Sequence, residues 1–222
     1  MGFTMDGSLT DRVTEFIGNK IIKGEYKPGD KIIESRIAEE LGLSHSPIRE
    51  ALRVLEKNRL VVLVPRKGAY VTEITEAYAD SLYDILIEML VLVIRKSVRN
   101  ANADDFAQVD AAITEAEQAA RAEDTEAYYN AIILFCVTSL SSCHDPLLEQ
   151  IISSLLPSLK RLLYPSFPYR KNNLSKNFTY MQEGARHLKN RDAGMAETCL
   201  RELYNLEKET LNESLKAGHF FK

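Results

Sequence analysis

The sequence has no apolar run long enough to cross a lipid bilayer. Its longest such run, residues 89–94, lies between Glu88 and Arg95, whereas a membrane-spanning helix needs about 20 apolar residues. Residues 1–20 also lack the basic start and the apolar stretch of a secretory signal peptide. We therefore expect a soluble protein of the cytoplasm.

Cysteine and catalytic motifs are also scarce. The three cysteines, Cys136, Cys143 and Cys199, form no C-x-x-C pair, and an odd number argues against a disulfide framework. We read them as small apolar core residues. The sequence has no glycine-rich phosphate loop and no nucleophile elbow. We therefore do not expect an enzyme, although catalytic groups can converge from distant positions.

The residues that are present describe a globular chain with an uneven charge. Hydrophobic residues make up 45% and charged residues 27% of the 222 positions. The net charge is −4, but residues 1–75 carry +1 and residues 76–222 carry −5. Within 44–67, six basic residues stand against two acidic ones. Because phosphate attraction is local, this segment is a candidate nucleic-acid surface.

The first 60 residues predict three helices. Apolar residues at Leu9, Val13, Phe16, Ile17 and Ile21 follow a helical stripe that should end near Gly24. A short second helix spans 34–41, with Gly42 as its C-terminal cap.

The third helix should begin at Ser46 as N-cap, with Pro47 in the first helical position. Its inward side carries Ile48, Ala51, Leu52 and Leu55, and its opposite side carries Arg49, Arg53 and Lys57.

A β-hairpin follows the third helix, and helices fill the rest of the chain. The β-branched run 60–64, the turn 65–68 and the run 69–72 predict a hairpin with a basic tip. Further helices are predicted near 75–99, 103–122, 124–143, 146–164, 172–190 and 192–217. The chain is therefore expected to be mainly α, with a winged helix-turn-helix over 1–74 and an all-α antiparallel bundle over 75–222.

Three helices followed by a basic hairpin suit DNA binding. A helix fits the major groove and its N-terminal residues reach base edges. Here that end carries Ser44, His45, Ser46 and Arg49, and Arg can bind guanine through two hydrogen bonds. The hairpin tip, with Arg66, Lys67 and Gly68, can lie along the neighbouring groove. Taken alone, the basic side of the third helix would be read as a solvated face; the helix start and basic hairpin favour the DNA interpretation.

The same residues resemble a known family. The segments 24–30, Ile33-Glu34, Ile37-Ala38, 41–44, 46–52, Leu55 and 67–71 are similar to the GntR family of bacterial repressors. The helical remainder resembles the FCD (fatty-acid-regulator-like) subfamily. The resemblance implies a homodimer that binds double-stranded DNA at an inverted-repeat operator, with affinity modulated by a small-molecule effector.

The resemblance also assigns DNA contacts. Ser44, Ser46 and Arg49 match the family's contact positions, and Gly68 matches its wing glycine. Two positions depart, since His45 stands where the family usually has Arg, and Ser35 stands where many members have Arg, with Arg36 beside it. The expected contacts are Arg36, Ser44, His45, Ser46, Pro47, Arg49, Arg53, Arg66, Lys67 and Gly68.

Many FCD domains hold a metal ion with an Asp-x3-His pair and two later histidines. At the corresponding positions this sequence has Ile132, Cys136, Met181 and Leu203. One cysteine cannot replace about four zinc ligands. We therefore expect the usual metal site to be absent and predict no cofactor; His144 and His187 read as surface or capping residues.

An apolar effector pocket is the sharper interpretation of these replacements, and a cavity filled by side chains is the alternative. Its expected lining is Ile132, Phe135, Cys136, Arg161, Tyr164, Tyr180, Met181 and Leu203. Tyr169 and Arg170 are further candidates, with a surface loop over 164–170 as the alternative. A dimer surface could include the strip Leu82, Ile85, Leu86, Met89, Leu90, Val93 and Ile94, unless that helix is simply central to the bundle.

The leading functional hypothesis is a DNA-binding transcription regulator, either repressor or activator, whose operator affinity responds to a bound effector. An enzyme housed in the helical bundle is one alternative. The other is a protein-interaction adaptor whose winged helix has lost DNA binding, for which Ser35 and His45 are the hints.

Overall fold

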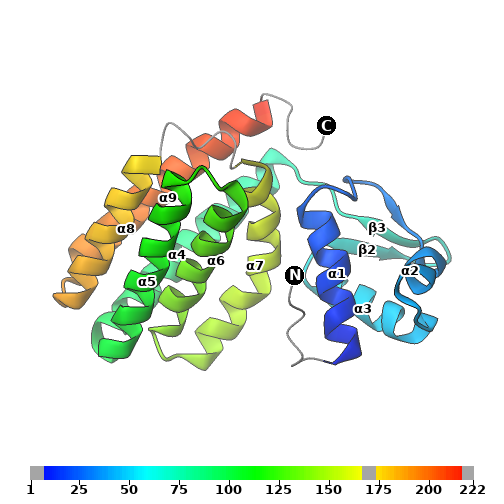
Figure 1. The fold of residues 1–222 in the computed structure, drawn as a ribbon, viewed down its shortest axis with the longest axis horizontal. Helices are drawn as coiled ribbons and strands as arrows, with labels where there is room; N and C mark the ends of the chain where they lie inside the picture. Colours follow the sequence, from blue (N-terminus) through cyan, green and yellow to red (C-terminus); the bar gives the residue numbers. More distant parts are fainter. Residues whose placement is uncertain (1–7, 167–173, 217–222) are drawn as a thin grey trace. The chain divides into compact units, whose positions relative to one another are not determined.

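The computed structural model describes residues 8–166 and 174–216 and divides them into two compact units (Figure 1). The first unit holds the residues up to Thr75 together with Ser154–Leu162, and the second holds the remaining ones. Tyr169, Arg170 and His219 lie outside the described residues.

Up to Thr75 the helices are α1 (Leu9–Ile22), α2 (Glu34–Leu41) and α3 (His45–Lys57), and a part of a later helix, Ser154–Leu162, joins them in the first unit. Local signals set their ends. The Ser8 hydroxyl accepts the Asp11 N–H, and the Asp11 carboxylate accepts the Ser8 N–H, which forms a capping box. Gly42 ends α2 with φ of 65°, a left-handed conformation that glycine adopts without steric cost. The predicted cap at Gly42 is confirmed.

The start of α3 differs from its prediction. The N-cap is Ser44, and His45 is the first helical residue, so that Ser46 and Pro47 lie inside the first turn. The first N–H groups of a helix have no partner within it, and proline at the third helical position therefore removes no hydrogen bond. The prediction of Ser46 as N-cap was wrong by two residues.

A three-stranded antiparallel sheet completes this unit. Its strands are β1 (Lys31–Ile32), β2 (Val61–Val64) and β3 (Gly68–Val71), in the order β1-β3-β2. The hairpin pairs Val64 with Gly68 and Val61 with Val71. The strand β1 was not predicted, because two residues are too few to show an alternating pattern.

One core joins these elements. It is built from apolar side chains of all three helices and all three strands, namely Val13, Ile17, Ile21, Ile32, Ile37, Ala38, Ile48, Ala51, Leu52, Leu55, Leu60, Val61, Ala69 and Val71. The helices and the hairpin are thus held as a single body, and the predicted winged helix-turn-helix is confirmed.

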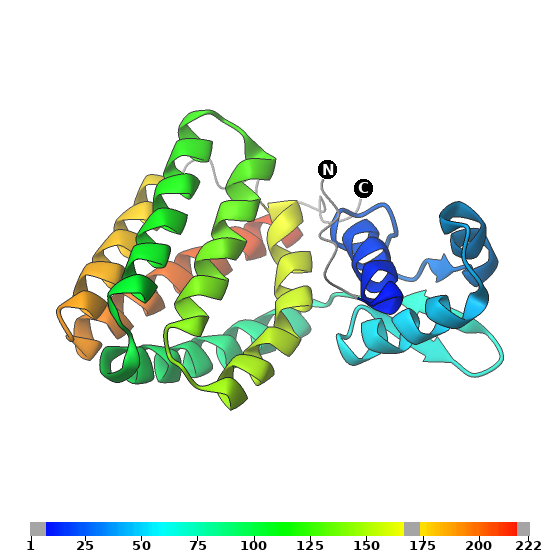
Figure 2. The same cartoon turned by 60° about the horizontal axis from the view of Figure 1, so that its bottom comes forward.

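The described residues after 75 form the helices α4 (Glu76–Asn100), α5 (Ala103–Arg121), α6 (Thr125–Ser141), α7 (Pro146–Ser166), α8 (Leu174–Lys189) and α9 (Ala193–Lys216). Helix α5 packs against α6 and α8, and α9 packs against α8 and α4 (Figure 2). The predicted helical bundle is confirmed. Among the described residues, no helix joins the length and the apolar character that a membrane crossing requires.

The apolar strip of α4 divides between two environments. Leu82, Leu86 and Val93 are buried inside the subunit, whereas Ile85 is 53% exposed. Met89, Leu90 and Ile94 are half-buried. Most of the strip therefore serves the bundle's own packing, and Ile85 lies on the outer side of the helix.

The side chain of Arg191 caps the C-terminal end of α4. Its guanidinium donates hydrogen bonds to the backbone oxygens of Ser97, Val98 and Ala101, and lies 5.4 Å from the ring centre of Phe106. The last carbonyls of a helix lack partners within it, and a cation there also favours the helix dipole. A side chain from the α8–α9 connection thus caps a helix about 90 residues earlier in the chain.

Arg191→Ala should lower the free energy of unfolding by about 2 kcal/mol, because it leaves the α4 carbonyls without their charged donor. Arg191→Lys should lose roughly half as much, since it keeps the charge but not the planar fork. Urea unfolding followed by circular dichroism measures both. Equal stability of the three proteins would show that the cap contributes nothing.

Candidate DNA interface and helical-domain cluster

Helix α3 has one buried face and one exposed face. Ile48, Ala51, Leu52 and Leu55 are at most 1% exposed. The side chains of Arg49 and Arg53 are 65% and 66% exposed. Ser44, His45 and Ser46, at the start of the helix, are also exposed. The helix therefore presents its polar N-terminal end to solvent while its apolar side fixes it in the core.

A carboxylate lies beside the two basic residues at this end. Glu34, the first residue of α2, accepts a hydrogen bond of 2.8 Å from Arg49 Nε, and His45 Nδ1 lies 4.0 Å from the same oxygen. Farther along α3, Arg53 pairs with Glu50 at 2.9 Å. Arg36 is exposed on α2.

The wing tip, residues 65–68, is exposed throughout. The Lys67 N–H donates to the Val64 carbonyl, and Arg66 has φ of 62°, which with Pro65 before it fits a type II turn. Gly68 has φ of 102°, a backbone conformation that side chains rarely adopt. The turn thus presents Arg66 and Lys67 to solvent.

Helix α3 and the hairpin are joined by a hydrogen bond. Glu56 on α3 accepts a hydrogen bond of 2.9 Å from the N–H of Leu63 on β2. Lys31, on β1, lies close to Gly68 and places its ammonium 5.9 Å from the ring centre of Tyr70. Lys31 is therefore a further cation beside the wing that the sequence reasoning missed, because β1 was not recognised.

Five of the predicted pocket residues meet in the second unit. The bundle cluster consists of Val109, Ile113, Met181, Ala185 and Leu203, with Ile132, Phe135, Phe178 and Tyr180 packed against it. It draws on α5, α6, α8 and α9. The predicted residues Ile132, Phe135, Tyr180, Met181 and Leu203 thus share one apolar environment.

The predicted residues Cys136 and Tyr164 interact with the phenol groups of neighbouring tyrosines. The Tyr164 ring lies edge-to-face against Tyr129, with ring centres 5.2 Å apart. Burial raises the pKa of Tyr129, and Tyr164 and the Cys136 thiol add to the rise. Burial, then Cys136, Tyr83 and other neighbours, raises the pKa of Tyr204. These phenols stay neutral near pH 7 and can donate hydrogen bonds.

The sequence reasoning missed Tyr129 and Tyr204. Tyr129 and Cys136 are seven positions apart on α6, a spacing that places them on one helix face. That spacing was the available signal for Tyr129.

Arg161 makes a different contact from the one expected. This residue, 2% exposed, belongs with Thr72 to the first unit. Its Nη1 donates to the Thr72 hydroxyl at 2.7 Å and its Nη2 donates to the Thr72 carbonyl at 2.6 Å. Two of its five donors are therefore committed to the residue that follows β3.

The donor groups do not fit the metal that the FCD resemblance implies. Ile132, Met181 and Leu203 occupy apolar surroundings, and Cys136 alone is a strong ligand. Within residues 8–166 and 174–216, no group of three or more His, Cys, Asp or Glu side chains is placed to hold a metal ion. We therefore derive no role for a metal.

Two histidines lie among carboxylates. His144 Nε2 lies 2.8 Å from an Asp105 oxygen. His187 lies 3.7 Å from Glu183 and 3.6 Å from Asp192. His144 thus links the α6–α7 connection to the first turn of α5, whereas His187 lies near Glu183 of its own helix and near Asp192, which directly precedes α9.

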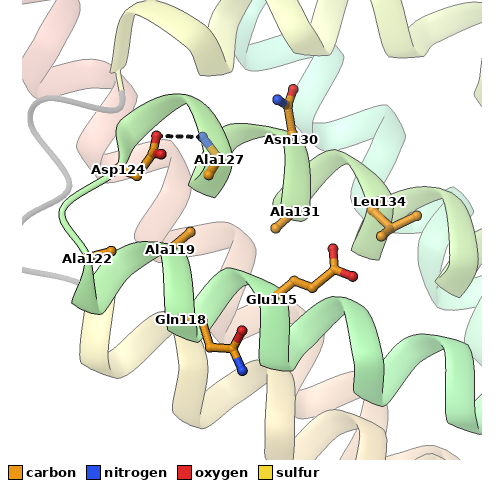
Figure 3. A pocket seen from close by; sticks show the side chains of 9 residues that line it. All are labelled: Glu115, Gln118, Ala119, Ala122, Asp124, Ala127, Asn130, Ala131 and Leu134. Atoms are coloured by element: carbon orange, nitrogen blue, oxygen red, sulfur yellow. Dashed lines mark hydrogen bonds between the residues drawn. The ribbon is translucent and has the colours of Figure 1, made fainter. Parts of the chain in front are cut away.

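A separate surface pocket of about 560 Å³ lies between α5 and α6 (Figure 3). Four alanines leave room there, and the polar side chains are Glu115, Gln118, Asp124 and Asn130. The Asp124 carboxylate accepts the Ala127 N–H at 2.9 Å and so caps α6. This pocket shares no residue with the bundle cluster.

Two family models match the chain. The model of the bacterial regulatory proteins of the gntR family covers residues 9–71. The model of the FCD domain covers residues 81–206, which is more than half of the chain.

Individual bacterial transcription regulators are also similar to this chain. A Bacillus subtilis protein named "Uncharacterized HTH-type transcriptional regulator YdhC" is 35% identical over 48% of each chain. The galactonate operon transcriptional repressor of Escherichia coli is 29% identical over 70% of this chain and 75% of its own. The structure of E. coli McbR/YncC superposes with a TM-score of 0.82 at 24% identity, over 94% of this chain and 99% of that one.

Because Asp105 pairs with His144, we expect the fold to lose stability in acid. Burial would raise the pKa of Asp105, but the Asn102 N–H and His144 together outweigh burial and lower it. Because the folded pKa lies below the unfolded one, the carboxylate stabilises the fold above its ordinary pKa of about 3.9, and this contribution disappears as pH falls through the folded value.

Asp105→Asn should therefore lower stability at pH 7 by on the order of 1 kcal/mol, and the difference from the parent should vanish toward pH 2. Urea unfolding across this pH range measures the difference. Asp104→Asn, which removes a charge from the same turn, is the control. A difference for Asp105→Asn that stays constant with pH would refute the assignment.

Proposed function

Because the chain belongs to the GntR family of bacterial regulatory proteins and carries an FCD effector-binding domain, we propose that it is a cytoplasmic homodimeric repressor of an inverted-repeat operator. Residues 1–74 bind DNA, and residues 75–222 bind the effector and the second subunit. The observation that carries the DNA-binding role is the joint exposure of the α3 start and the wing tip on one rigid unit. Family membership favours this role over the enzyme and adaptor alternatives.

Each DNA-contacting residue has a role that follows from its chemistry. Arg49 reads a guanine in the major groove through two hydrogen bonds. Ser44 and Ser46, at the helix start, bind phosphate oxygens. Arg66 and Lys67 at the wing tip neutralise phosphates, and Gly68 keeps the backbone close to the duplex. Arg36, His45, Pro47 and Arg53 complete the contact surface.

Repression and dimerisation rest on two separate observations. A relative is named as a repressor of the galactonate operon, which supports the negative sign of regulation. A dimer would place two α3 helices on the two halves of a palindromic site. On α4, Ile85 and Leu92 are 53% and 43% exposed, and their spacing of seven residues puts them on one helix face that a second copy can cover.

The effector follows from the lining of the bundle cluster. An apolar surface favours a ligand with a hydrocarbon portion, and a few polar groups orient it. Tyr180 packs against the cluster, and the phenol groups of Tyr129, Tyr164 and Tyr204 are further candidates for that purpose. A sugar acid would leave many hydroxyl groups without partners in this environment.

Arg49→Ala should weaken binding to the preferred duplex by roughly 1–3 kcal/mol and relax the base preference, because a base-reading contact is lost. Lys67→Ala should weaken all duplexes about equally and flatten the salt dependence, since it removes a phosphate contact. Fluorescence anisotropy on a duplex selected from a randomised library, and on mixed-sequence DNA, measures both. An equal loss on both duplexes for Arg49→Ala would exclude base reading.

Octanoate, which pairs a carboxylate with an apolar chain, should raise the melting temperature of the protein in the presence of EDTA, because ligand binding stabilises the fold without a metal. Galactonate should not. Leu203→Gln, which places an amide in the bundle cluster, should remove the octanoate shift. No shift with octanoate would favour a cluster filled by its own side chains, and a shift with galactonate that requires Mn²⁺ would contradict the apolar site.

A further inference from the structure

Glu34 is an acidic residue that lies beside two residues of the proposed DNA surface. Its carboxylate lies 2.8 Å from Arg49 Nε and 4.0 Å from His45 Nδ1. Its side chain is 29% exposed, against 65% for Arg49 and 53% for His45. The less exposed carboxylate therefore lies beneath two side chains that reach toward solvent.

The geometry of the ion pair leaves the reading edge of Arg49 available. A guanidinium has five N–H donors, one on Nε and four on the two terminal nitrogens. The contact with Glu34 uses Nε. An arginine that binds guanine through both terminal nitrogens can keep this contact, and a contact on Nε restricts the rotation of the guanidinium plane.

The negative charge of Glu34 affects the affinity for DNA and the sequence specificity in different ways. A carboxylate at this position repels DNA phosphates whatever the base sequence is. It therefore weakens binding to every duplex. The one contact that it strengthens is the base contact for which Arg49 must be held in one orientation. A residue that lowers general affinity and supports one base contact raises the ratio of specific to non-specific binding.

We propose that Glu34 is the positioning residue that sets the sequence specificity of Arg49. It holds the guanidinium in its base-reading orientation and at the same time opposes non-specific phosphate binding. This inference rests on the proposed DNA-binding function and adds a residue to it.

The test compares Glu34→Gln with Glu39→Gln in the full-length protein. Both changes remove one negative charge from α2, and Glu39 is exposed on the same helix. Glutamine keeps the size and an acceptor oxygen, and thermal melting checks that each variant folds. The probes are a duplex selected by the parent protein from a randomised library and poly(dI-dC) as non-specific DNA.

Glu34→Gln should bind poly(dI-dC) more tightly than the parent and should lower the ratio of selected to non-specific affinity by roughly ten-fold, a partial loss of a two-bond base contact. Its own library selection should relax at the base pair that Arg49→Ala also relaxes. Glu39→Gln should leave the ratio unchanged. An unchanged ratio for Glu34→Gln would overturn the proposal.

The Arg49→Ala background separates positioning from a general role of Glu34 at the start of α2. If Glu34 acts through Arg49, adding Glu34→Gln to Arg49→Ala should leave the ratio where Arg49→Ala puts it. A further fall in the ratio would contradict the proposal. A parent protein that selects no sequence would refute the proposed function itself, whereas a selective parent with an unchanged Glu34→Gln ratio refutes only the role of Glu34.

Discussion

The burial of one face of α3 is the constraint on which the proposed DNA-contacting surface depends. Ile48, Leu52 and Leu55 are almost fully enclosed in the core of the first unit, so the helix cannot rotate without exposing them. With 3.6 residues per turn, this fixes Arg49 and Arg53 on the solvent side. The same core holds β2 and β3, so apolar packing sets the position of the wing relative to α3, and the hydrogen bond from the Leu63 N–H to Glu56 adds to it.

Charged residues have two opposite effects on the attraction of this surface to DNA. The basic residues of α3 and the wing attract phosphates, whereas the chain as a whole carries −4. Attraction is screened over about 10 Å at moderate salt, so the local face determines the encounter with DNA. A carboxylate such as Glu34 within that face weakens the attraction, and its contact with Arg49 restricts the orientation of the guanidinium.

Periodicity allowed most of the fold to be predicted, and tertiary contacts account for what was missed. The bounds of α2 follow from local patterns and were predicted correctly, and the two hairpin strands were predicted to within one residue. The start of α3 was misplaced because a proline such as Pro47 fits any position of the first turn. Glu34 and Tyr204 were missed as site residues for another reason: their partners lie on other helices, and no local spacing connects them to Arg49 or Cys136.

If the proposed effector binds in the bundle cluster, the packing of that cluster limits its affinity. Met181 and Leu203 are less than 10% exposed, so a ligand that enters beside them must separate side chains that already stabilise the fold. The separation costs free energy, because each side chain gives up the dispersion attraction of the atoms packed against it. A ligand therefore binds with its intrinsic affinity reduced by the rarity of the open arrangement. In a metal-bound site the cation would supply part of that energy; in an apolar cluster the ligand's own hydrocarbon surface must replace the packing that it displaces.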